Sequence, residues 1–145
     1  MVRIITDSAA DFEPKEYEQL NVTCIPLRVM LGETEYLETV DLNKDQFFVL
    51  LASTGESPKT AQPSPRYLMD IFEDAKACGD EAIYITLSSA LSGTYQSAVM
   101  TCEDADSDSC FVVDSKNATG GQRLLVEYAV RLRDEGKSAA QIVEA

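Results

Sequence analysis

The stretch EAIYITLSSALSGTYQSAVM, residues 81–100, decides the fold of this chain. Its first part, residues 81–87, is rich in β-branched, aromatic and aliphatic side chains, which is typical of a strand buried on both faces. A turn of serine, glycine and threonine follows. Apolar side chains then recur at helical spacing from Tyr95 to Cys102. Such a turn presents free backbone N–H groups, hydroxyls and the positive end of a helix dipole, so the stretch predicts an anion site.

Segments on both sides repeat this order of strand and helix. Strands are expected at residues 2–6, 22–27 and 110–113, with helices between them. The alternation predicts an α/β fold of three layers, α/β/α, with a mainly parallel sheet. Ligands bind such sheets beyond the carboxyl ends of the strands. Three of the expected strands end there in small polar residues, namely Asp7 with Ser8, Ser88 with Ser89, and Asp114 with Ser115.

Other features are expected outside the parallel sheet. A turn at Gly32 predicts a small hairpin of residues 29–31 and 35–37, appended to the sheet. Residues 55–63 contain two prolines, and we expect irregular structure there. Two helices should carry apolar residues on one side: Phe47, Phe48, Leu50 and Leu51 on the inner side of the first, and Leu124, Leu125, Tyr128, Ala129 and Leu132 on the second.

Composition limits the classes of partner. The chain has 145 residues and a net charge of −13, from 25 acidic and 12 basic side chains. An acidic chain without a basic cluster is a poor partner for nucleic acid or anionic membranes. No run approaches the eighteen apolar residues of a membrane span, so no integral membrane association is expected. With no signal peptide pattern, we expect a cytoplasmic protein of one domain.

Catalytic patterns are missing from the sequence. The chain has no histidine to activate a serine nucleophile, and no S-x-x-K pattern. Neither a P-loop nor a G-x-G-x-x-G fingerprint is present. The carboxylates at residues 103–108 lack the glycine and glutamate of a calcium loop, and a solvated acidic loop is the favoured interpretation. We therefore expect no catalytic residue, no metal and no cofactor.

Recognition of an anion by neutral groups is the hypothesis that remains. Ser92 stands at the expected start of the helix that follows the turn, so it is either a plain N-cap or a ligand contact. Thr60 lies in the irregular stretch and is either a turn residue or a second contact. Binding requires both hydroxyls to converge on one carboxylate or phosphate oxygen, which the pattern alone does not establish.

Four segments resemble the DegV family of bacterial fatty-acid-binding proteins, in order and spacing. The L-S-G-T-Y sequence, residues 91–95, is the specific part of the resemblance. Support comes from T-D-S-A-A-D, residues 6–11, from K-T-A-Q-P-S-P, residues 59–65, and from V-D-S, residues 113–115. Ala9 and Ala61 stand where the family more often has a hydroxyl side chain. Neither change removes an expected ligand contact.

The resemblance implies a function for the anion site. Thr60 and Ser92 would hold the carboxylate of a long-chain fatty acid, assisted by amides near Gly93, with Asp7, Ser8, Ser89 and Ser115 as pocket neighbours. The acyl tail would enter an apolar tunnel between two domains. The protein would be no enzyme itself but would present its fatty acid to a partner, the fatty acid kinase subunit. The only ligand expected is the fatty acid.

Family members are about twice as long as this chain. Residues 1–145 would therefore be the amino-terminal domain alone, truncated, with the carboxyl-terminal α/β domain absent. A short helix expected after Ser138 ends within about two turns, too few to be stable by itself. A truncated chain of this kind would expose apolar surface and could pair as a homodimer. Two alternatives stay open: binding of a small phosphorylated metabolite at the same anion site, and a structural unit without activity.

Overall fold

Four parallel strands form the central sheet of the computed structural model, which describes residues 1–105 and 108–145. Their order is β2-β1-β6-β7, and every neighbouring pair is parallel. Each strand is short and strongly apolar, as expected for a sheet covered on both faces. The strands are β1 (Val2–Asp7), β2 (Val22–Ile25), β6 (Glu81–Thr86) and β7 (Cys110–Asp114).

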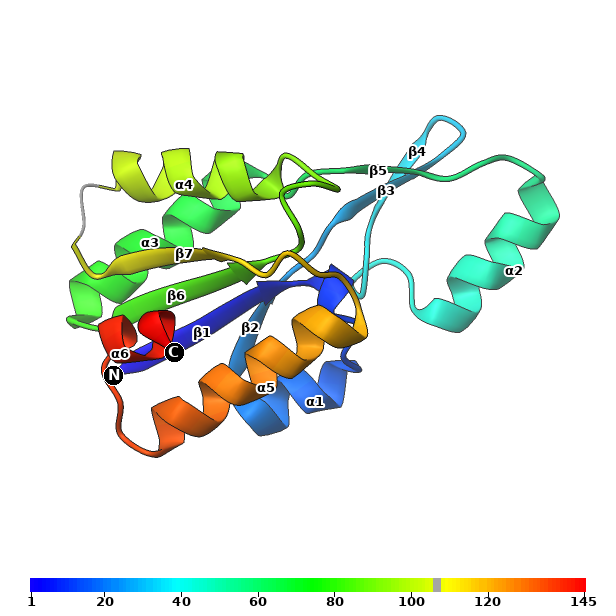
Figure 1. Cartoon of the computed structure of the whole chain (residues 1–145). Coiled ribbons are helices and arrows are strands. Elements are labelled where there is room, and N and C mark those ends of the chain that lie inside the picture. Colours follow the sequence, from blue (N-terminus) through cyan, green and yellow to red (C-terminus); the bar gives the residue numbers. More distant parts are fainter. Residues whose placement is uncertain (106–107) are drawn as a thin grey trace.

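Helices cover both faces of this sheet and complete the predicted α/β/α sandwich (Figure 1). One face packs on α1 (Pro14–Leu20), α5 (Gly120–Asp134) and α6 (Ala139–Glu144), and Ile4, Ile83 and Val126 belong to the apolar core on this side. The opposite face packs on α3 (Pro65–Cys78) and α4 (Thr94–Asp104), around Phe72 and Tyr84. The three-layer fold predicted from the alternation of strands and helices is confirmed.

A second, smaller sheet corrects two expectations. The predicted hairpin exists as β3 (Arg28–Leu31) and β4 (Thr34–Leu37), but it is not an extension of the parallel sheet. It joins β5 (Lys59–Ala61) in a separate antiparallel sheet of order β4-β3-β5. The supposedly irregular residues 55–63 thus contain a strand. A strand of three residues near two prolines is too short to show a periodic pattern. Its pairing partner β3 lies some thirty residues away in sequence, so no local signal indicated it.

Helix α2 (Lys44–Thr54) begins at the predicted capping box, in which Asn43 and Gln46 exchange hydrogen bonds. The prediction that α2 has a buried inner side is wrong, because none of its residues is buried and Phe48 is 64% exposed. Figure 1 shows the reason: α2 lies beyond the small sheet, at the end of the molecule away from both termini. The parallel sheet therefore gives this helix no surface to cover.

Helix α5 buries only part of the side that was expected: Ala129 and Leu132 are buried as predicted, whereas Leu125 and Tyr128 are partly exposed. Leu124 is 67% exposed, whereas Val126 is fully buried against the sheet. Gln122 is buried too, because its side-chain amide finds acceptors on β1 and β6. Near the start of α5 the buried side therefore consists of Gln122 and Val126 and not of Leu124, which the apolar pattern could not reveal. The acidic residues 103–108 lie partly outside the described residues, and Glu103 and Asp104 belong to α4.

Replacing Val126 by alanine should lower the free energy of unfolding by roughly 1.5–3 kcal/mol, from about 0.8 kcal/mol per buried carbon plus the cavity left behind. Leu124→Ser on the exposed side of the same helix should change it by less than about 0.5 kcal/mol. Urea unfolding of both variants measures the difference. Equal losses would contradict the observed orientation of α5.

Candidate anion-binding site

The strand order reverses at β1, since the chain passes from β1 to β2 on one side and later to β6 on the other. The carboxyl ends of β1 and β6 therefore mark the switch point, where open α/β sheets bind ligands. Asp7 ends β1 there, and the serine-rich turn follows β6. The small sheet and α2 extend from this same edge of the parallel sheet (Figure 1).

Asp7 is completely buried, and its carboxyl group accepts hydrogen bonds from several elements that meet at the switch point. Its Oδ1 accepts hydrogen bonds from the Ala9 N–H at 3.2 Å and from Gln122 Nε2 at 3.0 Å. Its Oδ2 accepts from the Leu87 N–H at 2.9 Å and from the Tyr84 hydroxyl at 3.4 Å. Burial raises the pKa of Asp7 above its ordinary value, although these four donors oppose the shift. This carboxyl group is a structural link between strands and helices.

The turn after β6 is held by its own hydroxyls. The N–H groups of Leu91 and Ser92 donate to the Ser88 carbonyl oxygen, and Ser92 Oγ accepts from the Thr94 N–H at 3.2 Å. Ser92 Oγ also lies 2.9 Å from Thr94 Oγ1. Gly93, not Ser92, occupies the N-cap position of α4, which corrects the N-cap interpretation of Ser92. The Ser92 hydroxyl nevertheless accepts the hydrogen bond of the first amide of the helix, that of Thr94.

Gly93 permits a close approach between two segments. A Cβ atom at this position would collide with the side-chain amide of Gln62. Glycine thus lets the segment of residues 59–65 lie directly against the start of α4. The N–H groups in the first turn of a helix lack acceptors within the helix. Ser92 Oγ accepts from the Thr94 N–H, and the amides that follow it in this turn face the end of the helix where an anion is favoured.

Thr60 and Ser92 line one open hollow between the small sheet and the start of α4. Its volume is about 560 Å³, and its walls come from β5, the residues after it and the turn after β6. The lining residues are Leu27, Arg28, Thr60, Ala61, Gln62, Pro63, Pro65, Leu87, Leu91 and Ser92. The structure therefore brings together two side chains that the sequence places far apart, while Gly93 lies next to the hollow without being among its lining residues.

A second cavity, of about 460 Å³, lies on the other side of β5. Apolar side chains of β3, β4 and α2 line it, among them Val29, Tyr36 and Phe47. Val29 pairs with both Tyr36 and Thr60 across the small sheet, so these three side chains share one face. Thr60 lines both cavities, and it stands at the boundary between a polar hollow and an apolar one.

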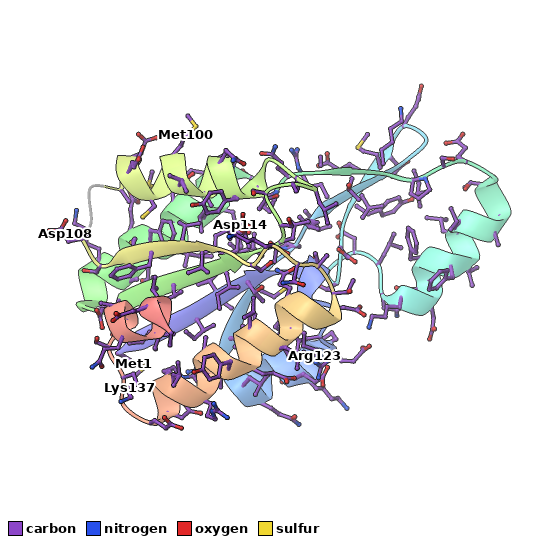
Figure 2. All side chains as sticks on the ribbon, in the orientation of Figure 1. Met1, Met100, Asp108, Asp114, Arg123 and Lys137 are labelled. Atoms are coloured by element: carbon purple, nitrogen blue, oxygen red, sulfur yellow. The ribbon has the colours of Figure 1, made fainter. Side chains whose placement is uncertain are left out.

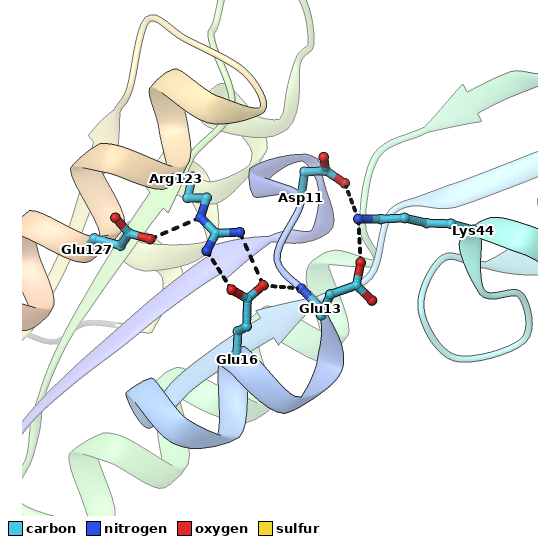
Figure 3. A network of polar contacts seen from close by, with 6 residues as sticks. All are labelled: Asp11, Glu13, Glu16, Lys44, Arg123 and Glu127. Carbon is cyan, nitrogen blue, oxygen red and sulfur yellow. Dashed lines mark hydrogen bonds and ion pairs between the residues drawn. The ribbon is translucent and has the colours of Figure 1, made fainter.

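Charged side chains close one rim of the apolar cavity. Lys44 at the start of α2 contacts Asp11 at 3.0 Å and Glu13 at 2.7 Å, and these hydrogen bonds raise the pKa of Lys44 (Figure 3). Arg123 of α5 forms a two-point pair with Glu16 in the same network, and its guanidinium stacks on the Phe12 ring at 4.4 Å. The network joins α2 to the helices beneath the sheet.

The remaining expected pocket neighbours have structural partners. Ser8 lines the apolar cavity, donates to Glu38 Oε2 at 2.6 Å and accepts from the Leu27 N–H. Ser89 and Ser115 are not among the residues lining either hollow, and neither is Asp7. Ser89 Oγ donates to Asp114 Oδ2 at 2.6 Å, and Figure 2 shows Asp114 at the end of β7.

Two polar lining residues were not singled out from the sequence. Gln62 lies within the T-x-Q-P-S pattern, which is a signal that could have identified it. Arg28 begins β3 and carries no such signal, because its position depends on the pairing of β3 with β5. In residues 1–105 and 108–145, no group of three or more Cys, Asp or Glu side chains could hold a metal ion. Within the same residues, no helix has the length and apolar character needed to cross a bilayer.

Comparisons with known proteins identify similar chains. The model of the DegV family matches residues 1–145. A "DegV domain-containing protein" of Caldanaerobacter subterraneus subsp. tengcongensis is 37% identical over 142 residues, covering 98% of this chain and 50% of that protein. The chain spans about half the length of the curated relatives it matches.

Solved structures agree with this relationship. A stearic acid-binding protein of Eubacterium ventriosum has a TM-score of 0.88 and 32% identity, over 99% of this chain and 51% of its own. DegV of Bacillus subtilis, described as a fatty acid binding protein, has a TM-score of 0.90 and 29% identity, over the same shares. A DegV family protein of Thermus thermophilus described for fatty acid binding has a TM-score of 0.87 and 27% identity, again over 99% and 51%.

Asp7→Asn should destabilise the fold, because an amide NH₂ would face at least one of the four donors that now meet the carboxylate. We expect a deficit of about 1–3 kcal/mol at about pH 4.5, measured by urea unfolding. A raised folded pKa means that the unfolded state loses its proton first. The stability from Asp7 is therefore complete below the unfolded pKa, near 3.9, and is lost as pH rises through the folded pKa. The deficit should narrow towards about pH 8.

Asp114→Asn is the matched control for this experiment. Partial burial opposes ionisation of Asp114, but hydrogen bonds from Ser89 and Lys116 outweigh it and lower its pKa. Its contribution is present at neutral pH and lost in acid, so the deficit of this variant should widen as pH rises. A deficit of Asp7→Asn that also widens would show that the hydrogen bonds to Asp7 outweigh its burial.

Proposed function

The chain belongs to the DegV family, and from that membership we propose that it binds a long-chain fatty acid through the carboxylate. The observation that carries the proposal is the position of Thr60, which lines the polar hollow together with Ser92 and also lines the apolar cavity. A fatty acid has the same division into a polar head and an apolar tail. Its carboxylate would accept hydrogen bonds from Thr60 and Ser92 and from amides near Gly93.

The acyl tail would lie against the apolar cavity of β3, β4 and α2. Burial of methylene groups supplies most of the affinity for such a ligand, at about 0.8 kcal/mol each. Contact with the acyl tail would then cover apolar side chains of α2 that the fold by itself leaves exposed. We further propose that residues 1–145 are the amino-terminal half of a two-domain protein, since similar solved chains are about twice as long. The second half would close the tunnel.

The protein would carry its ligand and not transform it. Neutral hydroxyls can bind an anion, but they are not general bases, and a hydroxyl becomes a strong nucleophile only when a general base lies beside it. We propose that phosphorylation of the bound carboxylate belongs to a partner kinase in the cytoplasm. Pairing of two copies of this chain is a further proposal, and sedimentation of the 145-residue chain with and without fatty acid would test it.

Ser92→Ala and Thr60→Val should each weaken fatty acid binding by roughly 10- to 100-fold, because a hydrogen bond to a charged group contributes about 1.5–3 kcal/mol. Titration of the 145-residue chain with palmitate measures the affinity. Ser97→Ala, one turn further along α4 and outside both hollows, is the control and should bind as the wild type does. Unchanged affinity in both site variants would overturn the assignment of Thr60 and Ser92.

Native mass spectrometry of the purified wild-type chain separates the two candidate ligands. A co-purifying long-chain acid supports fatty acid binding, whereas a phosphate ester supports a small phosphorylated metabolite. Absence of saturable binding to either would leave only the interpretation as a structural unit.

Phe47→Ser should weaken palmitate binding more than octanoate binding, because Phe47 lines the tail cavity and the longer palmitate tail buries more methylene groups there. Each buried methylene should raise wild-type affinity roughly fourfold, and the variant should lose part of this gain. Val49→Ser on the same helix is the control, since Val49 is 71% exposed and outside the cavity. Equal effects of the two substitutions on palmitate would place the tail elsewhere.

A further inference from the structure

The polar hollow contains one charged side chain, Arg28, among its ten lining residues. We propose that the Arg28 guanidinium is a third contact for the bound anion, beside the hydroxyls of Thr60 and Ser92. This inference rests on the proposed function and adds to it the group that supplies positive charge. It makes Arg28 a determinant of affinity and of salt dependence in this chain.

Backbone pairing and one hydrogen bond fix where Arg28 lies. Arg28 pairs with Ala61, the residue that follows Thr60 on β5. Its Nε donates to the carbonyl oxygen of Gln62 at 2.9 Å. The side chain of Gln62 in turn lies against Gly93 at the start of α4. The guanidinium is therefore tethered between the segment that carries Thr60 and the turn that carries Ser92.

The tether leaves donors of Arg28 free for a ligand. A guanidinium has five N–H donors in a planar fork, and Nε uses one of them. Nη1 lies 3.5 Å from Glu35 Oε2, at the limit of a hydrogen bond. Both side chains of that pair are substantially exposed, 37% and 46%, so the interaction is weak. An incoming carboxylate could accept two parallel N–H bonds in place of Glu35.

Net charge gives the physical reason for a cation at this point. The chain carries −13, so an anionic ligand approaches a repulsive field. Hydroxyls contribute dipoles but no net charge to offset that field. Screening limits effective interactions to about 8 Å at physiological ionic strength, so the nearest charge dominates. Arg28 is the cation placed at the hollow itself.

Strand geometry allows both faces of the small sheet to reach one anion. Thr60 pairs with Val29 and Arg28 pairs with Ala61, so Thr60 and Arg28 belong to opposite faces. Strand β5 is an edge strand, and both residues line the same hollow. An anion at that edge has the hydroxyl on one side and the guanidinium on the other.

Titration of the wild-type chain and the Arg28→Gln variant with palmitate, at low and high sodium chloride, tests the proposal. We expect Arg28→Gln to bind roughly tenfold more weakly at low salt and to lose most of the salt dependence, while Glu35→Gln binds more tightly. Lys59→Gln is the matched control: it removes the same charge from β5 at a residue outside the hollow. Urea unfolding of each variant checks that it is folded.

The outcomes separate the inference from the proposed function. If Ser92→Ala loses affinity while Arg28→Gln and Lys59→Gln behave alike, fatty acid binding stands and the role of Arg28 is overturned. If Arg28→Lys restores the salt dependence but not the affinity, charge and two-point geometry both contribute, as proposed. If the wild-type chain binds no fatty acid, the proposed function fails, and the role of Arg28 fails with it.

Discussion

Burial of the Asp7 carboxyl group is the constraint on which the rest of this structure depends. The group ends β1 and accepts hydrogen bonds from the residue after β6, from the turn after β1 and from α5. A buried carboxylate is costly unless donors surround it, so these elements must meet at one point. That point is the switch in strand order. Gln122 donates to Asp7 and to Thr6 together, which also explains why α5 turns a polar residue towards the core.

The small sheet depends on the same edge through Ser8, the next residue along the chain. Its hydroxyl accepts from the Leu27 N–H just before β3 and donates to Glu38 just after β4. Both ends of the β3–β4 hairpin are thereby fixed to the end of β1. Strand β5 pairs with β3, so Ser8, by fixing the hairpin that contains β3, also fixes the position of Thr60 on β5. Ser8, which was expected as a pocket neighbour, lines the apolar cavity and also positions the sheet that carries Thr60.

Local signals in the sequence predicted what local physics determines. The strand at residues 81–86, the capping box of Asn43 and the turn at Gly32 each depend on neighbours within a few residues, and each is confirmed. Strand β5 and the burial of Gln122 and Val126 on α5 depend on partners distant in sequence, and both were missed. For the candidate site the pattern indicated Thr60 and Ser92, whereas Arg28 needed the register between two strands. The contact of Gln62 with Gly93 could not be read from either segment alone.

An edge strand between two unlike cavities explains how a site without buried charge could orient an amphipathic ligand. Alternation along β5 places Thr60 with Val29 on the apolar side, and Ala61 with Arg28 on the other. A head group that moved into the apolar cavity would lose its donors, and a tail in the polar hollow would stay in contact with water. Opposite penalties of this kind select one orientation. The proposed donors are hydroxyls and an exposed guanidinium, which water can reach, so the energetic penalty for an empty site would be small and the fold would not depend on the ligand.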